Sequence, residues 1–423
     1  MKRMLIALMV FALTPIVSFA GPKIEVLHWW TSGGEAAALK VLKDDFAANG
    51  GEWMDMPVTG GGGDAANVTL KARIVAGNPP SASQIKGPTI QEYDQEGVVA
   101  PYNIDAVAQA EGWDNLLDPM IAAVHKCQNN SGPYCAAPVN IHRIDWLWAN
   151  KSVFDSNGLS MPTTWDELNA AADTLKAAGI IPFAHGGQAW QDATVFEAVA
   201  LGIGGNNYYK NCYVKLDENC LRSETTIKVF DQMRKLANYT DEGSPGRDWN
   251  VATGMVIEGK AGFQIMGDWA KGEFTAANKT PGVDYYCSST PSNNGYLYNV
   301  DSFIFYKTND PDKQAGQKLL AKLMMGKNFQ KVFNLYKGSI PARLDVPMDE
   351  FDQCAKTSNA DIKTAGAKGG LVPSFAHGMA QGNTMKAALQ DVITEHFNSS
   401  MSSKDAANAV SYTHLTLPTI LLV

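Results

Sequence analysis

The sequence from Lys23 to Gly51 reads KIEVLHWWTSGGEAAALKVLKDDFAANGG and contains a strand pattern followed directly by a helix pattern. The segment Lys23–His28 is rich in Ile, Val and Leu, which predicts a buried strand. Three large apolar residues then recur at helical spacing within residues 35–49, and Gly50-Gly51 is a typical helix stop. This order predicts a strand-helix unit of an α/β fold.

The same alternation continues along the chain. After the glycine run Gly60–Gly63, which we interpret as a flexible loop, a helix is expected through Val68–Ala76. Residues 261–266 and 301–306 have strand patterns, and the apolar periodicity predicts one long helix from about Asp312 to Leu335. Strands and helices are interspersed, so we predict an α/β sandwich with largely parallel sheets.

The N-terminus has the pattern of a secretory signal peptide. Lys2 and Arg3 precede an apolar run that ends in Ser18-Phe19-Ala20, and we expect cleavage after Ala20. A membrane anchor is the alternative, but spanning a bilayer takes about 20 apolar residues and Pro15 interrupts this shorter run. We therefore predict an exported, periplasmic protein.

Length and charge limit the function further. About 400 mature residues exceed what one hydrophobic core usually serves, which predicts two lobes. The formal net charge is -8, and loss of Lys2 and Arg3 makes the mature protein more negative. Negative charge disfavours a nucleic acid or an anionic membrane as partner, and an uncharged ligand fits better.

The chain has six cysteines, an even number that in an exported protein predicts disulfides. Spacing suggests Cys127 with Cys135 and Cys212 with Cys220, which leaves Cys287 for Cys354. Six cysteines allow about fifteen connectivities, so other pairings remain open. Zinc binding is a weaker alternative because no CxxC spacing occurs. We expect neither a metal nor another cofactor.

Four segments in the right order carry a family resemblance across nearly the whole mature chain. Leu27–Glu35 resembles the opening strand of extracellular solute-binding proteins of sugar ABC transporters, and Pro162–Leu168 resembles their PxTWxEL helix start. Glu258–Trp269 is similar to their GKAAMxxxGxW strand and turn, and Lys337–Arg343 to their GSIPxR stretch. The Trp29-Trp30 pair, with Lys337 and His377, most resembles the periplasmic glucose-binding branch.

The resemblance implies the two-lobe periplasmic-binding-protein fold of type II (solute-binding family 1), with a hinge between the lobes and the sugar in the cleft. Its expected segments are 1–20 as signal peptide, 21–135 and 293–342 as lobe I, 136–292 and 343–410 as lobe II, and 411–423 as an anomalous tail. The expected partners are a monosaccharide, with glucose favoured, and the membrane permease subunits of an ABC transporter. We expect a monomer that has no catalytic residues.

A pyranose needs aromatic planes against its C–H faces and fixed donors and acceptors around its hydroxyls. We expect planes from Trp29, Trp30 and Trp269. Glu35 and Asp301 are expected to accept hydrogen bonds from hydroxyls, and Lys86, Lys337 and His377 to donate to them. Asp301 interrupts an apolar stretch, where a charge is costly unless it is paired.

Each of these residues also has a structural interpretation. One tryptophan of the pair could belong to the core, because adjacent strand residues point to opposite faces. Glu35 could simply begin a helix and Lys337 could end one, where their charges suit the helix dipole. His377 could be a structural histidine. The family resemblance favours ligand binding for Lys337 and His377.

Two other classes of function were weighed. A glycosidase would need paired carboxylates, but the favoured residues include two lysines, which do not form a natural acid-base pair. A lectin or adhesion module would show serial short strands instead of alternating helices and strands.

The composition changes abruptly after Val410. The segment Ser411–Val423 is rich in Thr and Leu and contains Pro418. We expect the helical pattern of residues 405–410 to end here and interpret the tail as a sequence artefact, with a genuine C-terminal strand as the alternative.

Overall fold

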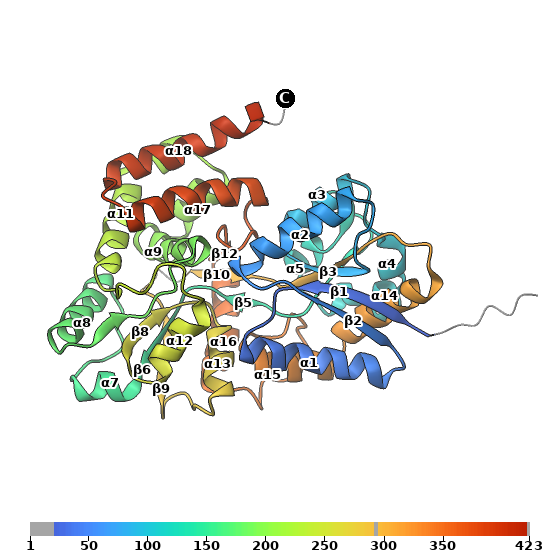
Figure 1. The fold of residues 1–423 in the computed structure, drawn as a ribbon, viewed down its shortest axis with the longest axis horizontal. Helices are drawn as coiled ribbons and strands as arrows, with labels where there is room; N and C mark the ends of the chain where they lie inside the picture. The colour runs from blue at the N-terminus through green and yellow to red at the C-terminus, as the bar shows by residue number, and fades with distance from the viewer. Residues whose placement is uncertain (1–20, 292–294, 421–423) are drawn as a thin grey trace, which may run out of the picture.

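In the computed structural model, which describes residues 21–291 and 295–420, the chain forms two α/β lobes side by side (Figure 1). The expected signal peptide lies outside these residues. The sheet of lobe I has the strand order β2-β1-β3-β11-β4. Its strands are β1 (Lys23–His28), β2 (Glu52–Pro57), β3 (Ala82–Ile85), β4 (Ala136–Pro138) and β11 (Ser302–Phe305). β1 is parallel to β2 and β3, whereas β11 is antiparallel to β3 and β4.

The sheet of lobe II has the order β7-β8-β6-β9. Its strands are β6 (Trp146–Asn150), β7 (Ile181–Phe183), β8 (Ala261–Ile265) and β9 (Tyr285–Ser289). A smaller sheet, β12-β10-β5, lies between the lobes and consists of β5 (His142–Arg143), β10 (Tyr296–Asn299) and β12 (Leu371–Pro373). The α/β architecture predicted from the sequence is therefore confirmed. The prediction of largely parallel sheets is wrong, because five of the nine strand pairings in the described residues are antiparallel.

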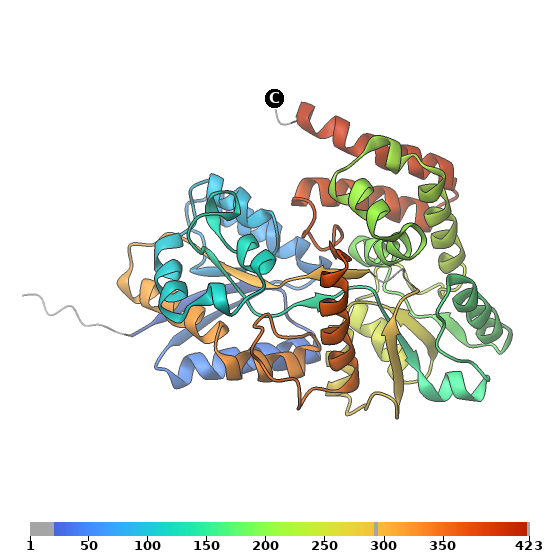
Figure 2. The same ribbon diagram turned by 180° about the vertical axis from the view of Figure 1, so that it is seen from behind.

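Helices cover both sheets. Those of lobe I are α1 (Gly33–Ala48), η1 (Gly61–Gly63), α2 (Asp64–Val75), α3 (Thr89–Gln95), α4 (Pro101–Glu111), η2 (Trp113–Asn115), α5 (Pro119–Val124), α6 (Cys127–Asn130), α14 (Pro311–Met324) and α15 (Lys327–Lys337). Those of lobe II are α7 (Lys151–Ser156), α8 (Trp165–Ala177), α9 (Ala189–Tyr209), η3 (Lys210–Val214), α10 (Glu218–Leu221), α11 (Glu224–Ala237), α12 (Trp249–Ile257), α13 (Ala270–Ala276), α17 (Asn383–Asn398) and α18 (Ser403–Ile420). α16 (Gln353–Ala367) stands between the lobes (Figure 2). Within the described residues, no helix combines the length and the hydropathy that a membrane span needs.

Each lobe has its own hydrophobic core. The first core includes β1, β3 and β11 with the inner faces of α1 and α14, and the second includes β6, β8 and α9. The segment between Ala342 and Met379 contributes residues to both cores. The expected lobe boundaries stay predictions.

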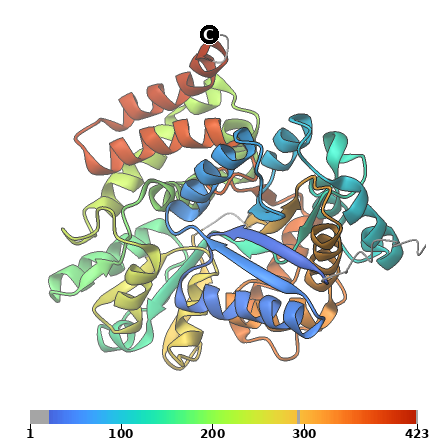
Figure 3. The same cartoon turned by 45° about the vertical axis from the view of Figure 1, so that its right-hand side comes forward.

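The prediction of one long helix from Asp312 to Leu335 is wrong. Helix α14 ends at Met324 and α15 begins at Lys327, with Gly326 in an extended backbone conformation as the N-cap. Glycine in a helix interior is about 1 kcal/mol less favourable than alanine, which makes it a natural break point. The break allows α15 to pack along α1, as Figure 3 shows at the lower edge of the molecule.

The expected end of the helical pattern at Val410 is also wrong, because α18 continues through Ile420. Ser411 is buried and accepts a hydrogen bond from Arg222 Nε at 2.7 Å, which holds this turn against lobe II. The origin of the tail residues stays a prediction.

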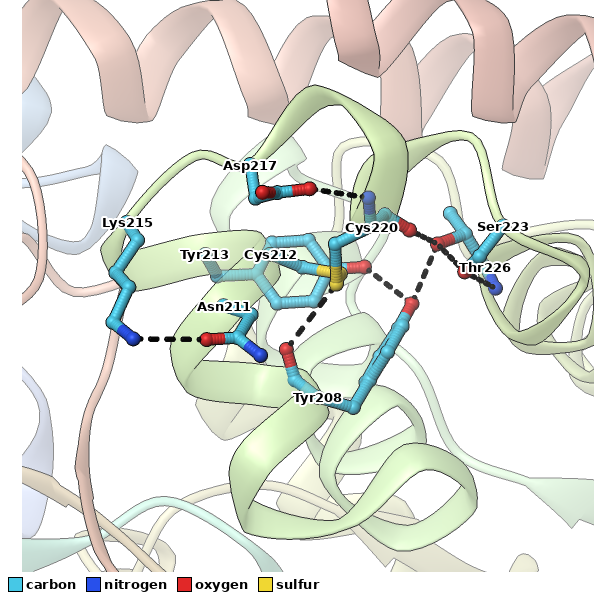
Figure 4. Close-up of a disulfide and its surroundings, with 9 residues drawn as sticks. All are labelled: Tyr208, Asn211, Cys212, Tyr213, Lys215, Asp217, Cys220, Ser223 and Thr226. Atoms are coloured by element: carbon cyan, nitrogen blue, oxygen red, sulfur yellow. Dashed lines mark hydrogen bonds between the residues drawn. A yellow bond between two sulfur atoms is a disulfide. The ribbon is translucent and has the colours of Figure 1, made fainter.

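The structure forms the disulfides that spacing suggested: Cys127–Cys135, Cys212–Cys220 and Cys287–Cys354. The second joins the middle of η3 to α10, where Asp217 caps the short helix by accepting from Cys220 N at 2.8 Å (Figure 4). The third links β9 to α16, so it ties the segment between the lobes to the sheet of lobe II.

Paired replacement of the disulfide cysteines by alanine should destabilise the protein according to loop length. A separation of 8 residues corresponds to about 2.5 kcal/mol and one of 67 to about 4.4 kcal/mol, because the longer loop loses more entropy on cross-linking. Urea unfolding should therefore give a larger loss for Cys287→Ala with Cys354→Ala than for Cys127→Ala with Cys135→Ala. Equal losses would contradict the loop-length argument.

Candidate functional site

A cleft between the lobes encloses about 180 Å³. It is lined by all eight residues that the sequence singled out for a ligand and by further residues from both lobes. The lining consists of Trp29, Trp30, Thr31, Ser32, Glu35, Thr59, Gly60, Gly62, Lys86, His142, Gln188, Trp190, Asp248, Trp249, Asn250, Trp269, Asn299, Asp301, Lys337 and His377.

The tandem tryptophans lie where β1 has just ended at His28. Both therefore reach the cleft wall, although alternation within a strand would have sent one of them to the core. The Trp29 backbone N–H donates to Gln84 Oε1 at 3.2 Å, which fixes the start of the segment between β1 and α1. Trp30 also packs edge-on against Phe303, with ring centroids 5.5 Å apart, so it serves the core and the cleft together.

Lys337 and Glu35 form a buried ion pair within lobe I. Lys337 is the last residue of α15, which Gly338 ends in a left-handed conformation, and its Nζ lies 2.9 Å from Glu35 Oε1. Glu35 is in the first turn of α1 and also accepts from Thr31 N at 3.3 Å. Glu35 thus lies at the start of one helix and Lys337 at the end of another, as the structural interpretation of the sequence proposed. Both residues also line the cleft.

Asp301 is paired with a histidine that sequence reasoning missed. His142 Nε2 lies 3.0 Å from Asp301 Oδ2, and His142 Nδ1 forms a short hydrogen bond with Asp268. Asp301 stands immediately before β11 of lobe I, Asp268 follows β8 of lobe II, and His142 is in β5 between them. The imidazole therefore joins the two lobes at the cleft.

Burial alone would lower the pKa of His142, but the charges and hydrogen bonds of Asp268 and Asp301 raise it above its ordinary value. Burial alone would raise the pKa of Asp301, but His142, Lys337 and Lys86 hold it well below its usual range. Both shifts favour a charged imidazolium between two carboxylates. A buried charge persists only when it is paired in this way.

Lys86 lies just beyond β3, with its Nζ 5.0 Å from the centroid of the Trp29 ring and 3.4 Å from Gly62 O. Burial lowers its pKa to about 8, while the nearby Asp301 opposes the shift. The ammonium is therefore mostly charged at neutral pH and can donate hydrogen bonds to a ligand in the cleft.

The lobe II wall is aromatic. Trp269 follows the turn at Gly267-Asp268, and its ring lies 5.2 Å from His142 and 5.0 Å from His377, both edge-on. Trp190 of α9 completes this wall at 6.3 Å from Trp269. Sequence reasoning missed Trp190, although it follows Gly186-Gly187, a turn signal of the kind that selected Trp269.

The two walls touch each other across the cleft. Gly34 N donates to Glu273 Oε1 of α13 at 2.9 Å, and Lys386 of α17 pairs with Asp64 of α2. A Cβ on Gly34 would lie 2.6 Å from Gly272 C, so only glycine permits this approach of backbones. The structure is therefore a closed form of the cleft.

A closed cleft between two α/β lobes, with aromatic planes and fixed charges on its walls, defines a two-lobe ligand-binding protein. The family model described as bacterial extracellular solute-binding protein matches residues 31–324. A probable sugar-binding periplasmic protein of Brucella melitensis is 48% identical over 384 residues, 90% of each chain. One of Rhizobium meliloti is 47% identical over 388 residues, 92% of each chain. The chain therefore belongs to the bacterial extracellular solute-binding protein family.

Solved structures show the same fold. The bacterial solute receptor AcbH, described as having an exclusive preference for β-D-galactopyranose, has a TM-score of 0.76 at 20% identity and covers 95% of this chain and 99% of its own. Maltose-bound MalE3 of T. maritima has a TM-score of 0.74 at 17% identity and covers 94% of this chain and 100% of its own.

Replacement of His142 by glutamine should destabilise the protein by about 3–5 kcal/mol near pH 6, because two buried carboxylates lose their shared partner. The folded pKa of His142 is raised, so its contribution is complete below the unfolded value of about 6.5 and is lost as pH rises through the folded pKa. Urea unfolding should show that the difference in the free energy of unfolding between wild type and His142→Gln becomes smaller from pH 6 to pH 9.

His125 is the matched control for His142. It is buried, and its pKa is lowered by burial to about 4. Its unfolded imidazole gains a proton below about pH 6.5 and favours unfolding there, so the gap for His125→Gln should widen from pH 6 to pH 9. A gap for His142→Gln with the same sign of pH dependence would contradict a charged His142.

Proposed function

We propose that this protein is a periplasmic receptor that captures a monosaccharide, with glucose preferred, and delivers it to the permease of an ABC transporter. The observation that carries the proposal is the composition of the cleft: five tryptophans and paired charges from both lobes surround about 180 Å³. Aromatic planes suit the C–H faces of a pyranose, and charged donors and acceptors suit its hydroxyls.

The size of the cleft supports a monosaccharide over a longer sugar. Its volume of about 180 Å³ lies below the roughly 300–1,000 Å³ typical of sites for drug-sized ligands. The names of the relatives from Brucella melitensis and Rhizobium meliloti support a sugar and a periplasmic location. The preference for glucose rests only on the resemblance of the tryptophan pair, Lys337 and His377 to the glucose-binding branch.

Hydrogen bonds to charged groups contribute roughly 1.5–3 kcal/mol each. Three or four of them, with one or two stacked rings, suffice for micromolar binding at about -8 kcal/mol after the costs of ordering and desolvation. Because the ligand would touch both walls only in the closed form, its binding would shift the population from open to closed. The closed form would then dock on the permease.

Calorimetric titration of the protein spanning Gly21–Val423, produced in an oxidising compartment, tests the proposal. The ligands are glucose, galactose, mannose, xylose and maltose, with product analysis of the same mixtures. We expect micromolar or tighter binding of one monosaccharide, weaker binding of maltose, and no turnover. Preferred binding of maltose would overturn the assignment of a monosaccharide ligand. The absence of heat with every sugar, or the hydrolysis of maltose, would overturn the receptor function.

The affinity for the sugar should also depend on Lys86. As pH rises through about 8, the buried ammonium loses its proton and the site loses a charged donor, so affinity should fall about 10-fold between pH 7 and pH 9.5. Titrations of Lys86→Met should show weaker binding at pH 7 and a smaller change with pH. Lys404→Met, at an exposed lysine of α18, should behave as wild type. An unchanged pH profile in Lys86→Met would assign the titration to another group.

A further inference from the structure

Helix α9 presents a buried polar face to the loop that carries His377. Thr194 and Glu197 lie one turn apart on this helix, and both are fully buried. Each makes hydrogen bonds to residues 374–377, although neither lines the cleft. Such polar side chains are costly in a helix core unless every hydrogen bond is satisfied, so their partners indicate their role.

The hydrogen bonds of Thr194 determine which ring nitrogen of His377 carries a proton. Thr194 Oγ1 donates its single hydrogen to Trp190 O at 2.8 Å. The same oxygen lies 2.9 Å from His377 Nε2, so it can only accept there and Nε2 must carry a hydrogen. Burial, with the charges of Lys86, Lys386 and His142, holds the pKa of His377 well below its ordinary value, and Asp301 opposes this only weakly. The ring is therefore neutral, and Nδ1 keeps its lone pair.

Glu197 fixes the loop itself. Its carboxylate accepts from Ser374 Oγ at 2.6 Å, from Phe375 N at 3.0 Å and from Ala376 N at 3.2 Å. Ser374 Oγ in turn accepts from His377 N at 3.0 Å. Tyr209 OH adds a further donor to Glu197 at 2.8 Å. Burial raises the pKa of Glu197 to about 8, although the hydrogen bonds from these donors oppose the shift.

We propose that Thr194 and Glu197 are positioning residues that make His377 a hydrogen-bond acceptor toward the cleft, so that the site selects a ligand hydroxyl that donates to His377 Nδ1. The proposal rests on the proposed sugar-binding function and deepens it. It reverses the donor role that the sequence alone suggested for His377. Lys86 and Lys337 can only donate hydrogen bonds. An acceptor at His377 would therefore let the cleft distinguish ligand hydroxyls that accept a hydrogen bond from one that donates.

The tautomer can be measured without any ligand. Long-range proton-nitrogen correlation spectra of the ¹⁵N-labelled protein at pH 7 distinguish a protonated from an unprotonated imidazole nitrogen, and His377→Asn identifies the signals of His377. We expect a neutral ring with hydrogen on Nε2 alone. A hydrogen on Nδ1, either alone or in an imidazolium, would overturn the proposal whatever the protein binds.

Variants of Thr194 separate a positioning role from a merely structural one. Thr194→Ser keeps the hydroxyl and should keep both the Nε2 tautomer and the affinity for glucose. Thr194→Val keeps the shape but removes the acceptor, so the spectrum should show a mixture of tautomers and the dissociation constant should rise about 2- to 10-fold. Unchanged tautomer in Thr194→Val would overturn the role of Thr194.

Glu197→Gln preserves volume but turns an amide N–H toward the donors of the loop. We expect displaced His377 signals and a dissociation constant for glucose raised at least 10-fold. The matched control is Asp192→Asn, a buried carboxylate of the same helix that bonds to His185 and Thr394 and not to the loop. It should lower the melting temperature without moving the His377 signals. Equal spectra for Glu197→Gln and wild type would overturn the role of Glu197.

Deoxyfluoro analogues of glucose test the direction of the ligand hydrogen bond. Fluorine cannot donate, so one analogue should bind wild type as weakly as the matching deoxy sugar and should lose that penalty in His377→Ala. If no position of the ring behaves in this way while glucose still binds, the acceptor role fails and the receptor function stands. If glucose and the other sugars do not bind, the receptor function fails and the tautomer remains a separate result.

Discussion

The buried imidazole of His142, held between Asp268 and Asp301, is the interaction on which the cleft depends. It lies where the chain passes between the lobes, and each carboxylate accepts a further hydrogen bond: Asp268 from Arg143 N at 2.9 Å, and Asp301 from Asn299 Nδ2 at 3.3 Å. Removing the imidazole would leave two buried carboxylates without their shared partner, although Lys337 and Lys86 would still act on Asp301. The charged imidazole therefore stabilises the region where the chain passes between the lobes, and it fixes the positions of the two carboxylates at the cleft.

The other buried charges of the cleft follow the same constraint. Lys337 is paired with Glu35, and Lys86 lies over the Trp29 ring within the influence of Asp301. An uncharged ligand can enter such a balanced site without bringing a new charge that needs a partner. It can still gain charge-assisted hydrogen bonds, which are stronger than those between neutral groups. This balance explains how a strongly charged wall can suit a neutral molecule.

Much of this arrangement could be predicted from the sequence because its signals are local. Alternating patterns gave the α/β fold, the small spacing of the cysteines gave the short disulfides, and an uncompensated charge in an apolar stretch singled out Asp301. The break at Gly326 was missed because apolar residues recur at helical spacing in both α14 and α15, and a single glycine between them is a weak signal. His142 and Glu197 were missed because their partners, Asp301 and Ser374, are 159 and 177 residues away. The same argument that selected Asp301 applies to Glu197, a charged residue in the largely apolar segment 193–201, whereas His142 lies among other polar residues.

The closed cleft retains unpaired polar groups. In the described part of the chain, Trp30 Nε1, Ser32 Oγ and Asn299 Oδ1 are buried without a hydrogen-bond partner, and all three residues line the cleft. Each buried unpaired group costs about 1–3 kcal/mol. Closure therefore carries a cost unless a water molecule or a ligand hydroxyl pairs with these groups. A ligand whose hydroxyls satisfied these groups would remove the cost only in the closed form, which is the differential affinity that couples binding to shape. In the proposed receptor, the unpaired groups would thus lower the population of a closed, empty protein, and a transport partner that recognises the closed form would meet mainly loaded molecules.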